Sequence, residues 1–184
     1  MKNILKSFFC LIVALSFIPI SHALVEISGK EEVKIFEEKG EWIVKTQNIT
    51  WRISKDKDTW ILKDGAQKTL LRAGQTPKQE IQLLSESSKS LATLKCENES
   101  CRLFEGDNLV LRIKEKSDKT NIYDGKDKRI YKVKTKPYGF SVKHESDNSR
   151  EWKIKGIKQI KGAALFAAPL PLEQRALLWR AWSP

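Results

Sequence analysis

The chain has 184 residues, with 34 Lys and Arg against 23 Asp and Glu, a formal net charge of +11, two His and three Cys. Hydrophobic residues make up 40% and charged residues 31%, which is typical of one globular domain and excludes a disordered or fibrous chain. So few His and Cys leave almost no ligands for a metal site or an iron–sulfur cluster. We therefore expect neither metal nor cofactor.

Residues 1–23 have the pattern of a cleaved signal peptide. Lys2 and Lys6 precede an apolar run from Phe8 to Ile20, and Ala23 ends a stretch of small residues. The run is about thirteen residues long, shorter than the roughly twenty that a membrane-spanning helix needs, so cleavage is favoured over a retained anchor. The sequence predicts an exported protein, periplasmic or secreted, with no transmembrane segment in the mature chain.

Two cysteines, Cys96 and Cys101, remain after the expected cleavage. An even number of cysteines in an exported chain favours pairing, so we predict a disulfide that closes a short hairpin loop. A redox-active pair is the alternative. It is disfavoured because four residues separate the cysteines, whereas the thioredoxin-type motif has two.

Residues 24–161 consist of short segments that alternate apolar and polar residues, the pattern of β-strands. Trp42, Trp51 and Trp60 recur every nine residues, a spacing that suits one strand and one turn. Further along, strand, turn and strand units repeat, and their turns centre on Asp64-Gly65, Ser85 to Ser88, Glu105-Gly106, Asp124-Gly125 and Asp147-Asn148. We predict an all-β fold, an antiparallel meander of about twelve short strands.

Residues 162–184 change character: they are rich in Ala and Leu and have helical spacing. Alternation gives the sheet one apolar face, and that face must be buried against another element. We therefore expect a closed barrel around, or capped by, this hydrophobic C-terminal helix within the same domain. The alternative is a helix that lies on a membrane, with Trp179 and Trp182 at the interface and Arg175 and Arg180 towards lipid phosphates.

The sequence has no clear arrangement of catalytic residues. His144 is the one histidine of the expected mature chain and lies in a polar stretch beside Glu145 and Ser146, where sequence neighbours do not form a triad. An acidic cluster, Glu31, Glu32, Glu37 and Glu38, lies among lysines and is interpreted as solvated strand ends. The sequence contains no glycine-rich phosphate loop. We predict that the protein is not an enzyme.

Positive charge is the remaining functional lead. Alternation places five lysines on the solvent-exposed faces of strands, and they form the candidate basic surface: Lys132, Lys134, Lys136, Lys153 and Lys155. Such a surface attracts anionic lipid, an anionic envelope polymer or an acidic protein partner through the same electrostatics. Nucleic acid is disfavoured, because the interleaved aromatic residues alternate towards the core. The alternative is that these lysines only keep the strands soluble.

The repeated acidic-Gly turns at Asp64-Gly65, Glu105-Gly106 and Asp124-Gly125, followed by an Ala/Leu-rich final helix, resemble the tubby C-terminal, phospholipid scramblase and LURP-one-like superfamily. The resemblance covers most of residues 30–182. It implies a closed barrel around a C-terminal helix and an association with anionic lipid head groups. Export departs from the lipid-binding members, which work inside cells, and no head-group site of the superfamily matches particular residues of this chain.

Overall fold

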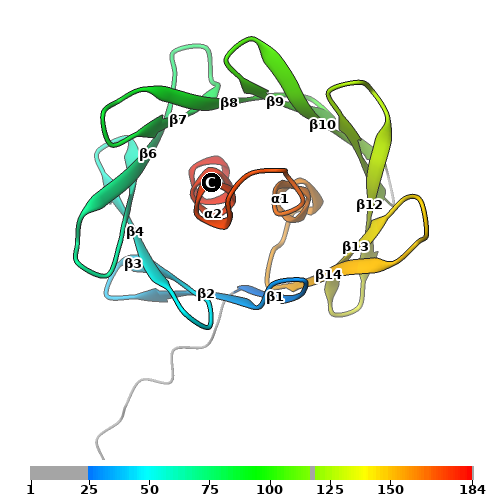
Figure 1. Cartoon of the computed structure of the whole chain (residues 1–184), viewed down its shortest axis with the longest axis horizontal. Helices are drawn as coiled ribbons and strands as arrows, with labels where there is room; N and C mark the ends of the chain where they lie inside the picture. Colours follow the sequence, from blue (N-terminus) through cyan, green and yellow to red (C-terminus); the bar gives the residue numbers. More distant parts are fainter. Residues whose placement is uncertain (1–24, 117–118, 184) are drawn as a thin grey trace, which may run out of the picture.

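The computed structural model describes residues 25–116 and 119–183, which form a closed antiparallel β-barrel with two short helices inside it (Figure 1). The predicted signal peptide, residues 1–23, lies outside the described residues. Each strand pairs with its neighbours in sequence, and the first strand pairs with the last to close the ring. The prediction of an all-β meander with a C-terminal helix is confirmed.

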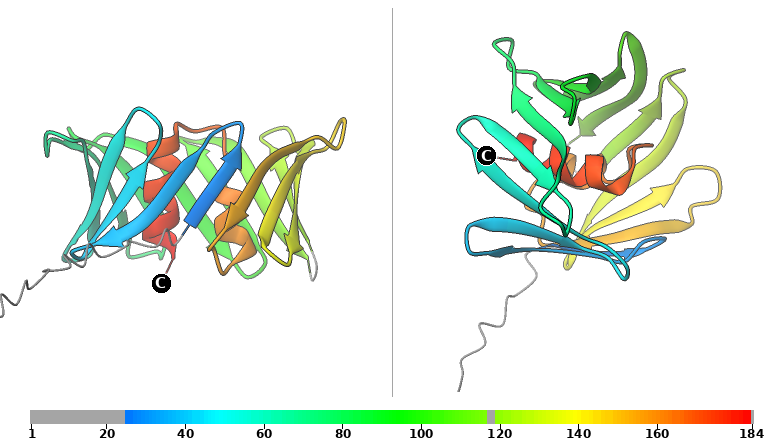
Figure 2. Two further views of the ribbon diagram at one scale, coloured as in Figure 1. Left: turned by 90° about the horizontal axis from the view of Figure 1, so that it is seen from below. Right: turned by 60° about the vertical axis from the view of Figure 1, so that its left-hand side comes forward.

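Fourteen strands make the wall: β1 Val25–Gly29, β2 Val33–Glu38, β3 Glu41–Lys45, β4 Thr50–Asp56, β5 Thr59–Lys63, β6 Thr69–Gln75, β7 Ile81–Ser85, β8 Ser90–Glu97, β9 Ser100–Glu105, β10 Asn108–Lys116, β11 Lys119–Asp124, β12 Arg129–Lys136, β13 Gly139–His144 and β14 Arg150–Lys155. The helices inside are α1 Ile160–Leu165 and α2 Leu172–Trp182. We call the end where β1 begins and α2 ends the C-terminal end, and the opposite end, with the α1–α2 connection, the linker end (Figure 2).

Strict alternation explains why the strands form a barrel. In β4, Trp51 and Ile53 are buried while Arg52 is half-buried, and in β12 Val133 is fully buried between exposed or half-buried lysines. Apolar residues from each of the fourteen strands line the inner face, which the helices fill with Ala163, Ala164, Leu165, Phe166, Ala176, Leu177 and Leu178. The sequence pattern thus predicts the face that each strand presents to the core.

Two turns at the linker end are stabilised by the same hydrogen bonds from an aspartate side chain. The Asp64 carboxylate accepts hydrogen bonds from the backbone N–H groups of Ala66 and Lys68, both at 2.9 Å. The Asp124 carboxylate repeats this with Lys126 and Lys128 at the same distances. Because each aspartate satisfies backbone donors of its own turn, the predicted acidic-Gly hairpins form where expected.

The barrel has fourteen strands where the sequence predicts about twelve. Of the acidic cluster interpreted as solvated strand ends, Glu37 and Glu38 lie in β2, and Glu31 and Glu32 lie in the turn before it. β1 closes the barrel, since Glu26 faces Lys155 and Ile27 faces Ile154 across the seam with β14. Gly29 is required there: a Cβ at this position would lie 2.0 Å from the Glu151 carbonyl oxygen.

The C-terminal segment is the core of the barrel rather than a membrane-lying helix. Trp179 and Arg175 of α2 are each 6% exposed, so neither is available to a membrane surface. A break over residues 166–171 splits the segment into α1 and α2, and Pro171 precedes the first residue of α2. Within the described residues, no helix combines the length and apolar character required to cross a bilayer.

The tryptophans of the nine-residue repeat point into the barrel. Trp42 meets Trp179 of α2 edge-on, with ring centroids 5.7 Å apart, and Trp51 is 8% exposed. Trp60 is partly buried and packs against the core. The repeat therefore places one large aromatic side chain per strand on the inner face, where Trp42 and Trp60 contact the last helix.

Candidate anion-binding surface

The five lysines of the predicted basic surface come together on the outer wall of the barrel over β12, β13 and β14. Strand pairing arranges them in two rows. In the first row Lys132 faces Lys143 of β13 and Asn121 of β11. In the second row Lys134 faces Ser141 of β13, which in turn faces Lys153 of β14. Two strands that are not neighbours in sequence thus contribute to one surface.

Two further lysines belong to this surface. Lys143 lies directly opposite Lys132, and Lys119 of β11 lies directly opposite Lys134. Both follow the alternation of their strands, but the sequence does not reveal which strands are neighbours across a row. We call the outward lysines of β11 to β14 the lysine face: Lys119, Lys132, Lys134, Lys136, Lys143, Lys153 and Lys155.

Charge on the lysine face is poorly compensated. Like charges directly opposite each other on a sheet are destabilising. Among the described residues of β11 to β14, the carboxylates are Asp124, which caps its own turn, and Glu151, which is buried at the linker end. Lys155 has an ion pair, with Glu26 of β1 at 3.1 Å. The other six lysines of the face form no salt bridge in the described part of the chain.

Ion pairs are more common on the rest of the wall. On its outer faces and turns, cations meet carboxylates: Arg52 with Glu41 at 3.2 Å, Lys95 with Glu80 at 2.9 Å and Lys68 with Glu86 at 3.4 Å. Such exposed pairs contribute little stability each, but they compensate part of the positive charge there. Cations also face each other elsewhere on the wall, as Lys34 does Lys45 and Lys95 does Arg102, so the lysine face is distinguished by how many of its lysines on adjoining strands have no salt bridge.

Two short polar side chains lie beneath the lysines. Asn121 and Ser141 point outward, yet each is 2% exposed. Each sits between lysines in its row, and long lysine stems cover neighbouring surface while their ammonium groups stay in water. The Asn121 Oδ1 atom has no hydrogen-bond partner. The face is thus a packed layer of lysine stems with a strip of amide and hydroxyl groups below it.

One aromatic ring supports the layer. The Nζ atom of Lys153 lies 4.3 Å from the centre of the Tyr138 ring, a cation–π contact that restrains the lysine side chain. Beside it, Lys153 and Lys155 line a hollow of 240 Å³ together with Glu26, Ile27, Ser28, Glu32, Val33 and Lys34. The edge of the lysine face is therefore hollowed, and Glu26 and Glu32 mark where the positive sector ends.

The cysteine pair lies at the C-terminal end. Cys96 of β8 and Cys101 of β9 face each other across the hairpin, with Cα atoms 4.1 Å apart and sulfur atoms at bonding distance, 2.07 Å. The positions agree with the predicted disulfide. The hairpin turn also contacts α1, because the Lys161 ammonium donates to the Asn98 carbonyl oxygen.

Reduction of this disulfide is expected to lower the free energy of unfolding by about 2 kcal/mol, because the closed loop is short and restricts the unfolded chain only modestly. Urea unfolding followed by circular dichroism, with and without reductant, measures the difference. The double variant Cys96→Ala/Cys101→Ala is the control and should be insensitive to reductant. A loss of strand signal without urea would contradict the expectation, since the barrel has its own core.

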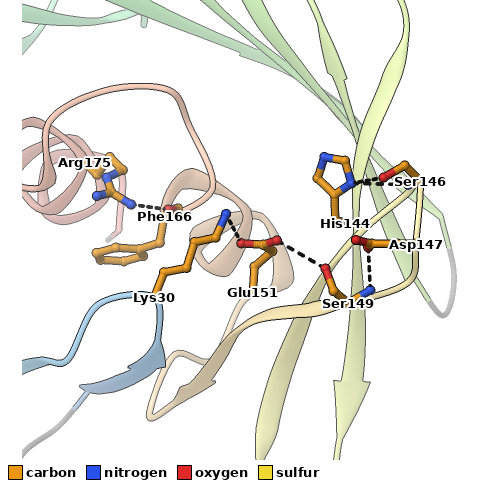
Figure 3. A network of polar contacts seen from close by, with 8 residues as sticks. All are labelled: Lys30, His144, Ser146, Asp147, Ser149, Glu151, Phe166 and Arg175. Atoms are coloured by element: carbon orange, nitrogen blue, oxygen red, sulfur yellow. Dashed lines mark hydrogen bonds and ion pairs between the residues drawn. The ribbon is translucent and has the colours of Figure 1, made fainter.

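The histidine region forms a polar network (Figure 3). The His144 Nδ1 atom lies 2.7 Å from the Ser146 hydroxyl, two residues along the same turn. The Asp147 carboxylate accepts the Ser149 backbone N–H at 2.8 Å, and this contact lowers the pKa of Asp147. Because Asp147 is bound to the backbone of its own turn, it does not orient the imidazole as a triad acid would.

One member of the acidic cluster, Glu31 in the turn between β1 and β2, has a structural contact. Glu31 forms two hydrogen bonds with the Arg175 guanidinium, at 2.7 and 2.8 Å, and Arg175 also donates to the Phe166 carbonyl oxygen at 2.6 Å. Lys30 pairs with Glu151, which raises the pKa of Lys30. The described residues contain no group of three potential metal-ligating side chains.

At the C-terminal end the wall stands away from the last turn of α2. Hollows of 360 to 510 Å³ surround Arg180, Ala181, Trp182 and Ser183. Here the Arg180 guanidinium lies between the rings of Trp42 and Trp60, 4.6 and 4.2 Å from their centres. Sequence reasoning placed Arg180 towards lipid phosphates only in the alternative of a membrane-lying helix, and it did not identify this stack, because the inner partners of α2 are set by the barrel.

No protein-family model matches the chain, and no curated protein matches it. Among solved structures, the chain is similar to the X-ray structure of a protein from Arabidopsis thaliana, with 16% sequence identity over 66% of this chain and 80% of that chain. The TM-score is 0.42. A likeness at this level carries no conclusion about fold or function, which here rest on the residues themselves.

Proposed function

We propose that the protein is a non-enzymatic, exported binding module whose lysine face holds an anionic component of the cell envelope, such as lipid head groups. The main support is the direct opposition of like charges, Lys132 with Lys143 and Lys134 with Lys119. Opposed lysines reduce stability unless a counter-anion lies between them, and a surface of phosphates supplies such anions. This proposal agrees with the tubby-like resemblance.

The triple variant Lys132→Gln/Lys134→Gln/Lys153→Gln is expected to weaken binding to anionic vesicles roughly hundredfold, since each lysine near an anionic surface contributes about 1 kcal/mol. Sedimentation of mature protein with phosphatidylcholine vesicles, with and without phosphatidylglycerol, measures it. Binding should require the anionic lipid and fall steeply with salt.

A matched control removes three lysines outside the face, Lys39→Gln/Lys78→Gln/Lys89→Gln, with the same change in net charge. All three are exposed. If both triple variants lose binding equally, net charge and not the lysine face is responsible. If the unaltered protein does not bind anionic vesicles at low salt, the lipid proposal is wrong, and stoichiometric capture of one acidic protein would favour the alternative, an envelope interaction component.

A further inference from the structure

A second candidate site lies inside the C-terminal end of the barrel, away from the lysine face. It is a pocket of 490 Å³, within the range of roughly 300 to 1,000 Å³ that small-molecule sites occupy. Aliphatic and aromatic side chains, two cations and a few polar groups line it: Val25, Trp42, Gly156, Ile157, Lys158, Gln159, Trp179, Arg180 and Ser183. None of these described residues is acidic.

The apolar side of the pocket is rigid. Trp42 and Trp179 meet edge-on, and Trp179 also packs against Phe166 with ring centroids 6.0 Å apart. Val25 is 1% exposed and Ile157 7%, so both are fixed by the barrel core behind them. Hydrocarbon that enters such a pocket gains the contacts of a packed core without reordering the protein.

The polar side is a cation with incomplete hydrogen bonding. The Arg180 guanidinium lies 4.6 and 4.2 Å from the ring centres of Trp42 and Trp60, and its Nη1 atom donates to the Ser183 carbonyl oxygen at 3.0 Å. Its Nε atom is buried without a partner. Burial lowers the pKa of Arg180, and the Glu37 carboxylate offsets this only in part. An anion at this point would restore interactions that the buried guanidinium has lost.

The two sides together define the ligand. An apolar chain fits the surface of Trp42, Trp179 and Ile157, and an anionic head fits Arg180, with the exposed Lys158 at the rim. We propose that this pocket binds an anionic amphiphile, a single alkyl chain that ends in a carboxylate or a phosphate. This goes beyond the proposed function, because the lysine face lies on the outer wall and the pocket opens beside α2.

Alkyl carboxylates and monoalkyl phosphates brominated near the end of the chain test the proposal, because bromine quenches indole fluorescence only at close range. We expect quenching of the mature protein below the critical micelle concentration, with affinity rising about fourfold per added methylene until the pocket is full. The two head groups, titrated separately, distinguish a fatty acid from a phospholipid fragment as the source. Equal quenching by the brominated alcohol of the same length would overturn the proposal.

Two variants probe the cationic end. Arg180→Gln should weaken binding of the carboxylate about tenfold or more, and a melting curve shows whether it still folds. Lys158→Glu alters an exposed side chain and should weaken binding about fivefold without loss of stability. Lys78→Gln, an exposed lysine in the β6–β7 turn, is the control and should leave the titration unchanged.

The lysine-face triple variant keeps the two proposals apart. It should bind the amphiphile as the unaltered protein does, while its binding to vesicles falls. Loss of quenching in this variant would place the amphiphile on the lysine face and contradict the pocket. Quenching that survives when vesicle binding is absent altogether would support the pocket and reject the proposed function alone.

Discussion

Replacement of Gly125 by alanine is expected to destabilise the barrel by about 2 to 3 kcal/mol, whereas the same change at Gly65 should alter the free energy of unfolding by less than about 0.5 kcal/mol. The two glycines follow the aspartates of equivalent turns. A Cβ at Gly125 would lie 2.0 Å from the carbonyl oxygen of Leu109, which is backbone and cannot rotate away. At Gly65 nothing lies within 4 Å.

Urea unfolding and thermal unfolding of the two variants, each beside the unaltered protein, test this directly. The Gly125→Ala change should lower the melting temperature by roughly 4 to 12 °C. Gly65→Ala serves as the control for the loss of glycine flexibility in the unfolded chain, an effect that both variants share. Equal stability of the two would show that the hairpin shifts to make room, and the close approach of β11 to β10 would not be a fixed feature.

The second large effect is expected at Glu31. Glu31→Gln should lower the free energy of unfolding by about 2 kcal/mol, because it leaves the Arg175 guanidinium, 6% exposed, without its counter-charge, while solvent screens the half-buried Glu31 side of the pair. Glu32→Gln is the control: Glu32 is the adjacent residue, is exposed, and should change stability by less than about 0.5 kcal/mol.

A double variant separates the buried charge from simple loss of a contact. In Glu31→Gln/Arg175→Met the uncompensated cation is gone, so stability should recover by about 1 kcal/mol or more relative to Glu31→Gln alone. The urea midpoint reports each step. A double variant less stable than both single variants would show that the Phe166 carbonyl oxygen, which Arg175 also holds, matters more than the ion pair.

Much of the wall could be predicted from sequence because alternation is a local signal. In β12 the order Tyr131, Lys132, Val133, Lys134 already separates core from solvent, and the Asp64 and Asp124 turns carry their own hydrogen bonds. In β1 and β2 the local signal is weaker, because each strand has one short apolar pair, Val25 with Ile27 and Val33 with Ile35, near acidic residues. Their burial depends on the seam with β14, which no local pattern reveals.

The candidate sites were harder to predict because they depend on which strands are neighbours. Lys132 and Lys153 were identified from alternation alone, but Lys119 and Lys143 join the same surface only through cross-strand register. Arg180 was placed on the right helix, but the side chains that surround it were not identified. Its two indole partners come from β3 and β5, more than a hundred residues earlier in the chain.

The closing seam has a consequence for the order of folding. Every strand pair but one joins segments adjacent in sequence, whereas the Glu26–Lys155 contact joins residues 129 positions apart. Local hairpins can form as soon as their residues are available, but contacts of this separation carry the largest loop-closure cost and form late. Since α1 and α2 follow β14 and end up enclosed, the ring must still be open when they enter. The barrel can therefore close only after α1 and α2 have packed inside it.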